Sequence, residues 1–198
     1  SYSSTLNSVL GRVTYSFDQR YNATVTLRAD GSSRFAKGHQ WGYFPSVGLS
    51  WNIDKERFLH LGKQVSFLQL RLNGGVVGNQ EIGDFRYIAN IVPNTYYFND
   101  VPVTAYVVEN LPNPNLKWET TASYNIGLST GFFDSRLTFT IDAYYKKTSD
   151  LLLDVPIESS TGFSSALRNI GSVSNKGIEF EATGILLQQK NWNWKASV

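Results

Sequence analysis

The feature that most constrains this sequence is a two-residue alternation of apolar and polar side chains that recurs along the whole chain. Between Tyr21 and Asp30, every second residue is apolar and the residues between them are polar. Because successive side chains of a β-strand point to opposite faces, this period predicts strands with one apolar and one polar face. The predicted strands cover residues 6–18, 21–30, 43–53, 68–76, 118–128, 137–146, 178–186 and 192–198. Short turns join several of them as hairpins, so the expected fold class is all-β and antiparallel.

Composition and charge argue against several other classes of protein. The 18 basic and 16 acidic residues leave a net charge of only +2, which gives a nucleic-acid partner no basic stripe to bind. Cysteine is absent, so disulfides, thiol nucleophiles and thiolate metal sites are excluded. No apolar run approaches the roughly 18 residues of a membrane-spanning helix. His39 and His60 fall in separate connections, and no nucleophile motif is present, so we expect no metal, no cofactor and no enzymatic activity.

The connections between the predicted strands alternate in length. They are short at 18–20, 131–135 and 188–191, intermediate at 31–42 and 55–65, and long at 78–116 and 149–175. We expect one helical turn within 55–65 and a short strand within 151–157, whereas 78–116 shows no sustained alternation. Long loops at one rim and short turns at the other are typical of outer-membrane β-barrels.

Alternation by itself fits a soluble β-sandwich as well as a membrane barrel. The predicted strands run to about ten residues, close to the roughly 9 to 11 that cross a bilayer. Mid-strand charges fall on the polar face, and we expect none on the apolar face. Aromatic residues gather near the short-turn ends (Tyr15, Phe17, Tyr21, Trp51, Trp192, Trp194) and near the long-loop ends (Tyr43, Trp118, Tyr145). These features favour a barrel with aromatic girdles at both interfaces, and a surface glycan-binding β-sandwich without transport is the alternative.

Six segments also carry motifs in a fixed order. They are SRFAK with WGYFPSV at 33–47, LRLNGGVVGNQEIG at 70–83, NPNLKWETT at 113–121, NIGL at 125–128, DAYYKKT at 142–148 and NIGSVSNKGIE at 169–179. Together they resemble SusC/RagA-type TonB-dependent receptors, which are nutrient importers of gram-negative bacteria, and they cover most of the chain. Departures from the family pattern, at Ala36 and at Asn73–Gly74, are modest.

The resemblance implies a transmembrane antiparallel barrel of about 22 strands with a plugged lumen, of which residues 1–198 are a partial barrel domain. The plug and the N-terminal extension are expected outside this segment. The implied function is import of an oligosaccharide or a peptide across the outer membrane. The implied partners are a SusD-like surface lipoprotein, the TonB–ExbB–ExbD complex, outer-membrane lipid and the solute itself.

Two groups of residues are candidates for the functional site. Tyr96, Tyr97, Asn99 and Asp100 lie in the longest connection, and aromatic rings beside amides and carboxylates suit sugar or peptide recognition. The same rings could instead pack against neighbouring loops or against the lipoprotein. The second group comprises the charges of the polar face: Arg28, Arg71, Glu119, Asp142, Glu179 and Glu181. They could line the transport path, but we favour contact with the plug, which fills the lumen in this family.

The length of the chain also bears on its organisation. Eight strands could close a narrow barrel, but the long connections suit a wide rim. An open sheet in lipid would leave the N–H and C=O groups of its edges unpaired, at several kcal/mol each. We therefore expect the 198 residues to be about a third of a larger barrel and not to fold alone.

Overall fold

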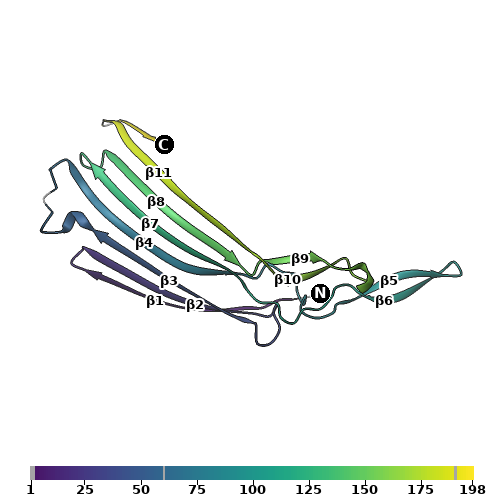
Figure 1. Cartoon of the computed structure of the whole chain (residues 1–198). Helices are drawn as coiled ribbons and strands as arrows, with labels where there is room; N and C mark the ends of the chain where they lie inside the picture. Colours follow the sequence, from purple (N-terminus) through teal and green to yellow (C-terminus); the bar gives the residue numbers. More distant parts are fainter. Residues whose placement is uncertain (1–2, 60, 190) are drawn as a thin grey trace.

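Eight strands form one antiparallel sheet in the computed structural model, which describes residues 3–59, 61–189 and 191–198. The strands are β1 (Leu6–Phe17), β2 (Tyr21–Ser32), β3 (Trp41–Asn52), β4 (Val65–Asn79), β7 (Glu119–Phe132), β8 (Leu137–Ser149), β11 (Ser172–Gln189) and β12 (Trp192–Ser197). They lie side by side in that order (Figure 1). The all-β, antiparallel prediction is confirmed, and the sheet is open, with β1 and β12 at its edges. His60 lies outside the described residues.

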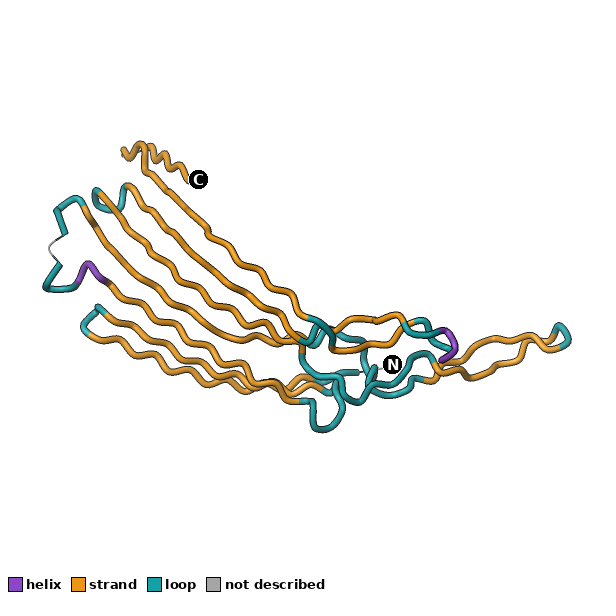
Figure 2. Tube along the Cα trace, in the orientation of Figure 1, coloured by secondary structure: helices purple, strands orange, loops and turns teal. Residues whose placement is uncertain are grey.

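The two long connections, 80–118 and 150–171, lie at the same end of the sheet, as predicted, and the three shortest connections lie at the other end. The β1–β2, β3–β4, β7–β8 and β11–β12 connections lie at one end, and the β2–β3, β4–β7 and β8–β11 connections lie at the other (Figure 2). The β3–β4 connection (53–64) departs from the sorting, since it is longer than the β2–β3 connection (33–40). Asp18 and Gln19 in the first turn, and Phe133, Asp134 and Ser135 in the third, take positive φ values that let the chain reverse within a few residues. We call these two ends the turn end and the loop end.

Two short 3₁₀ helices lie within the connections. The helical turn expected within 55–65 is found earlier, at η1 (Ile53–Lys55), and β4 already begins at Val65. The second, η2 (Ser159–Thr161), lies at the loop end. No helix in the described ranges is long and apolar enough to cross a membrane.

The long connections contain more regular structure than the sequence predicted. Residues 78–116 hold a hairpin of β5 (Ile91–Phe98) and β6 (Val101–Val108), so the expectation of an irregular segment was wrong there. The strand expected within 151–157 is confirmed as β9 (Leu152–Pro156), which pairs with β10 (Ser165–Asn169). Both two-stranded sheets extend away from the main sheet at the loop end (Figure 1).

The main sheet has one apolar and one polar face, and it buries little of either. On the apolar face Val25 is 55% exposed, Leu27 53% and Ile141 47%, and no second sheet of the described residues packs against them. This arrangement gives the β-sandwich alternative no support. The expectation of an uncharged apolar face holds in the middle of the strands, but Lys147 and Lys176 lie on this face near the loop end.

The buried core lies at the loop end. It consists of Phe35, Phe44, Ile82, Leu116, Trp118 and Leu167, and we call it the loop-end core. The Trp118 ring centroid lies 5.4 Å from that of Phe35 and 5.3 Å from that of Phe44, and its Nε1 donates to the Gln40 carbonyl at 3.0 Å. Trp118 is therefore a core residue, and placing it in an interfacial girdle was wrong. The cause is that Trp118 precedes the first residue of β7, so strand alternation does not govern its direction.

Candidate functional site

The polar face carries a row of charged side chains across four neighbouring strands. The strand register aligns Arg71 of β4 with Gly127 of β7, Gly127 with Asp142 of β8, and Asp142 with Glu179 of β11. Arg71 Nη2 donates to Asp142 Oδ2 at 3.2 Å and Oδ1 at 3.4 Å, across the intervening strand. Three of the predicted polar-face residues are thus brought together in what we call the charged row.

Gly127 makes this ion pair geometrically feasible. A Cβ on Gly127 would clash with Oδ1 of Asp142 and would lie 3.0 Å from Nη2 of Arg71. The two side chains therefore meet in the space that a side chain at position 127 would fill. The role of Gly127 was not predicted, because it depends on the strands on both sides of β7 and not on neighbours in the sequence.

Glu179 is the member of the charged row that has no ion-pair partner among the described residues. Its side chain is exposed and makes no ion pair with any described residue, although it lies opposite Asp142. Two like charges facing each other across a strand pair disfavour the isolated sheet. Glu179 lines a hollow of the polar face together with Asp30 and four basic residues, which are Arg12, Arg28, Arg71 and Lys146.

The other predicted charges lie apart from this row and have local partners. Arg28 Nε donates to both oxygens of Asp30 at 2.8 Å, and Glu181 accepts from the Thr183 hydroxyl at 3.3 Å. Glu119 lies at the loop end, where it accepts from Asn79 Nδ2 at 3.3 Å and from the Leu152 N–H at 3.0 Å. Glu119 therefore holds the start of β9 against the main sheet.

The β5–β6 hairpin places the four predicted ligand residues near its tip. Tyr96 and Tyr97 are adjacent in β5 and both exposed, so their rings lie on opposite faces of the hairpin. Asn99 and Asp100 form the connecting turn, with φ values of 49° and 60°. Two consecutive positive φ values are the requirement of a type I′ turn, which Asn and Asp tolerate. Both residues therefore have a structural role at the tip, and ligand contact by any of the four stays a prediction.

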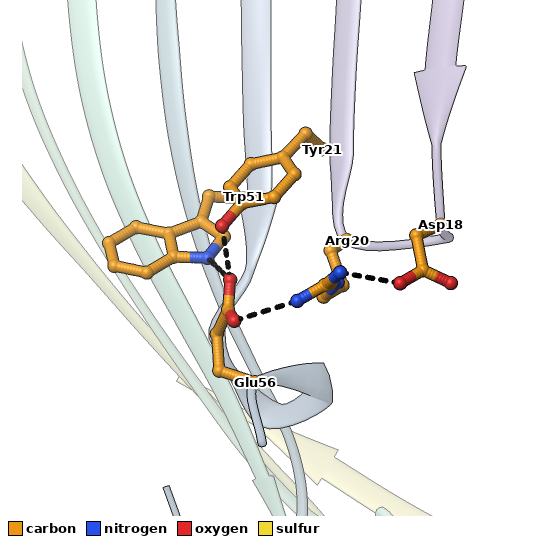
Figure 3. Close-up of polar contacts among 5 residues, drawn as sticks. All are labelled: Asp18, Arg20, Tyr21, Trp51 and Glu56. Carbon is orange, nitrogen blue, oxygen red and sulfur yellow. Dashed lines mark hydrogen bonds and ion pairs between the residues drawn. The ribbon is translucent and has the colours of Figure 1, made fainter. Parts of the chain in front are cut away.

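A buried carboxylate at the turn end joins Tyr21 of β2 and Trp51 of β3 to the β3–β4 connection. Oε1 of Glu56 accepts hydrogen bonds from the Tyr21 hydroxyl and, at 3.0 Å, from Trp51 Nε1 (Figure 3). Oε2 accepts from Arg20 Nη1 at 3.1 Å, and Arg20 also pairs with Asp18. We call these five residues the turn-end cluster. The sequence did not reveal it, because the cluster joins residues of the β1–β2 turn, of β2, of β3 and of the β3–β4 connection, which meet only in the folded sheet.

These hydrogen bonds make the charge state of Glu56 matter for stability. The bonds from Tyr21 and Trp51, with help from Arg20, hold the pKa of Glu56 below its ordinary value of 4.5. A lowered pKa in the folded state means that the stabilisation is fully present above the unfolded-state pKa and is lost as the pH falls through the folded-state pKa. We expect the thermal midpoint of the full-length protein to fall as the pH drops below the ordinary pKa of a glutamate, because Glu56 then begins to lose this stabilisation.

Glu56→Gln provides the measurement. The amide oxygen can still accept from Tyr21 and Trp51, but its NH₂ group cannot accept from Arg20, so this variant should unfold earlier at neutral pH and show a flatter dependence on pH below about 5. Thermal unfolding of both proteins across this pH range tests the prediction. Parallel curves for the two proteins would show that Glu56 does not contribute to the acid dependence.

No cluster of metal-ligating side chains occurs in the described ranges, since no three His, Cys, Asp or Glu residues there converge. What the strands do provide is an antiparallel sheet with long strands, one apolar face, one polar charged face, and short and long connections at opposite ends. This combination is typical of a segment of a membrane-spanning β-barrel.

Comparison with known proteins identifies the family. The family model described as "TonB dependent receptor-like, beta-barrel" matches residues 1–198, and the chain belongs to this family. The chain is 43% identical to the TonB-dependent receptor SusC of Bacteroides thetaiotaomicron, covering 98% of this chain and 20% of SusC. It is 38% identical to the TonB-dependent receptor P26 of Formosa agariphila, covering 96% of this chain and 19% of that receptor. The suspected resemblance to SusC-type receptors is thereby confirmed.

Solved structures agree with this assignment. The chain superposes on the RagAB peptide transporter with a TM-score of 0.87 and 33% identity, covering 98% of this chain and 21% of that one. The siderophore receptor PirA of Pseudomonas aeruginosa gives a TM-score of 0.61 at 14% identity, which shows a shared fold alone. The chain thus spans about a fifth of the length of the curated relatives given above.

Proposed function

We propose that residues 1–198 are part of the barrel domain of an outer-membrane importer, with the plug and N-terminal extension supplied by other parts of the receptor. The observation that supports this most directly is the two-faced sheet, whose apolar face is not covered by any other sheet of the described residues and is composed as a lipid-facing surface requires. In this arrangement the loop end faces the exterior and the turn end faces the periplasm. The chain itself catalyses no reaction: its strands form a wall of the transport path.

The cargo we propose is an oligosaccharide or a peptide. SusC and the RagAB peptide transporter are relatives over almost the whole of this chain, which supports these two classes. A SusD-like lipoprotein would cover the loop end, where the two short hairpins extend beyond the sheet. Energy would come from the TonB–ExbB–ExbD complex through the plug.

The polar face would meet the plug. The charged row presents Arg71 and Asp142 as a neutral pair, whereas Glu179 has no cation among the described residues. Arg28, Glu119 and Glu181 have local partners, so we propose that they contact the plug only through their remaining hydrogen-bonding capacity. Glu179 is then the polar-face residue with the greatest need for a basic partner on the plug.

Uptake by cells tests the proposed function. A strain that lacks the full receptor should lose growth on one class of cargo, either oligosaccharide or peptide, and regain it when the receptor is restored. Growth on both classes without the receptor would contradict import as its function.

The hairpin tip offers a second test, because turn geometry and side-chain chemistry can be separated there. Replacing both Asn99 and Asp100 by Gly keeps positive φ values accessible while removing the amide and the carboxylate. If these side chains contact the cargo, cargo affinity of the full receptor should fall about tenfold or more, as at other polar contacts in binding hot spots. Tyr96→Ala and Tyr97→Ala should differ, since the two rings face opposite sides. Calorimetric titration that gives unchanged affinity for all three variants would remove the hairpin tip from the cargo site.

A further inference from the structure

Two lysines interrupt the apolar face, and both lie near the loop end. Lys147 is close to the end of β8, and Lys176 is close to the start of β11. Following the register across the eight strands, all other charged residues within them fall on the polar face. Both lysine side chains are exposed, and neither forms an ion pair with a described residue.

The depth of these lysines fits the boundary between lipid and water. In β8 the apolar face is uncharged from Leu137 to Tyr145, and Lys147 is the next residue on that face. At about 3.4 Å per residue this uncharged stretch is about 27 Å long, which spans about 21 Å of depth for a strand tilted by roughly 40°. In β11 the uncharged stretch of the apolar face runs from Gly184 back to Ile178, and Lys176 follows. With the apolar face in lipid, this depth would place both lysines at the level of the headgroups at the loop end.

The surroundings of the two lysines contain donors and lack carboxylates. Lys147 faces Ser174 across the strand pair, and Lys176 faces Tyr145, which in turn faces Tyr124. The two lysines are therefore diagonal neighbours on one face, at a separation of about 7 to 8 Å between backbones. By contrast, Arg28 and Arg71 on the polar face each pair with an Asp. An anion that bridged the two lysines could also accept hydrogen bonds from the serine and the tyrosine hydroxyls.

We propose that Lys147, Lys176 and the adjoining hydroxyls of Ser174 and Tyr145 form a binding site for the phosphate of a lipid headgroup in the leaflet at the loop end. A lipid is the occupant because the site lies directly above an apolar surface that would hold the acyl chains, while its two positive charges complement a phosphorylated headgroup. This inference goes beyond import, and it depends on the proposed placement of the apolar face in lipid.

The test uses the full receptor in phosphatidylcholine nanodiscs that also contain lipid A, and it compares lipid A carrying two phosphates with its fully dephosphorylated form. Native mass spectrometry of receptor released from the discs measures the lipid that stays bound. We expect wild-type receptor to retain the phosphorylated form preferentially. The double variant Lys147→Gln, Lys176→Gln should lose about 25-fold in that retention, because each basic residue near an anionic surface contributes about fivefold.

Lys146→Gln is the matched control, since Lys146 adjoins Lys147 but lies on the polar face with its Nζ 5.6 Å from the centroid of the Tyr144 ring. It should retain lipid as the wild type does, and Lys147→Arg with Lys176→Arg should also retain it. Three outcomes would overturn the proposal. Lys146→Gln could lose as much bound lipid as the double Gln variant, or the double Gln variant could retain as much as the wild type. In the third, free inorganic phosphate alone would displace the lipid. Failure of the wild type to insert into the discs would instead contradict the proposed membrane placement.

Discussion

Ile141→Arg should destabilise the full receptor by about 2 to 4 kcal/mol, the cost of an arginine on the lipid-facing surface near the middle of a bilayer. Ile141 lies in the middle of the uncharged stretch of β8 and is flanked on the apolar face by Leu128 and Phe180. No carboxylate is near enough on this face to neutralise the new charge. Urea titration of the receptor in phospholipid vesicles measures the change in the free energy of unfolding.

The matched control is Ser149→Arg, on the same strand and the same face but at the loop end. Near the interface the cost of an arginine falls to about 0 to 1 kcal/mol. Both variants introduce an arginine on the same face. The difference between their free energies of unfolding therefore reports how deep each position lies in the bilayer. Equal destabilisation by both would mean that the apolar face of β8 does not cross the hydrocarbon layer.

Trp118→Ala should remove the packing that holds the long connections in place at the loop end. Trp118 packs between Phe35, from the β2–β3 connection, and Phe44 of β3, in a core that also includes Leu167 of β10. Removing a buried Trp side chain costs about 3 to 5 kcal/mol. The strands pair independently of this core, so we expect the lost stabilisation to open the connections at the loop end and to leave the sheet folded. Cleavage by a protease within residues 80–118 should then be accelerated about a hundredfold or more.

Two further variants serve as controls for this experiment. Trp118→Phe keeps an aromatic ring in the core but removes part of the ring volume and the hydrogen bond to the Gln40 carbonyl, so it should cost clearly less than the alanine variant. Tyr106→Ala removes an aromatic ring of β6 that is 74% exposed and should leave the cleavage rate near that of the wild type. A Trp118→Ala receptor that resists the protease as the wild type does would show that the connections are held by other contacts.

The sequence predicted the strands best where local alternation determines which way side chains point. β2 and β8 show this, since every second residue of each faces a continuous surface and a register slip would reverse the faces. The hairpin of β5 and β6 was missed because both of its faces are exposed, so apolar residues such as Tyr96 and Tyr97 follow one another without alternation. Its Asn99–Asp100 turn was the available signal.

The candidate site was only partly predictable, because its interacting residues lie far apart in the sequence and meet only in the folded sheet. Arg71 and Asp142 were both assigned to the polar face, but their ion pair depends on β7 lying between them with a glycine at position 127. Glu56 escaped notice because its partners Tyr21 and Trp51 come from β2 and β3 and reach it only after the sheet has formed. Pairing between distant strands is set by the fold as a whole, which a local pattern does not report.

The alternating exposure of β8 to lipid tests the central claim most directly. This chain contains no cysteine, so single cysteines at Thr138, Phe139, Thr140 and Ile141 can carry a fluorescent label in a full receptor freed of any other reactive thiol. With nitroxide-labelled lipid in the vesicles, labels at positions 139 and 141 should be quenched strongly, and labels at 138 and 140 weakly, with a period of two residues. Equal quenching at all four positions, or stronger quenching at 138 and 140, would contradict the assignment of this sheet to the wall of a membrane barrel.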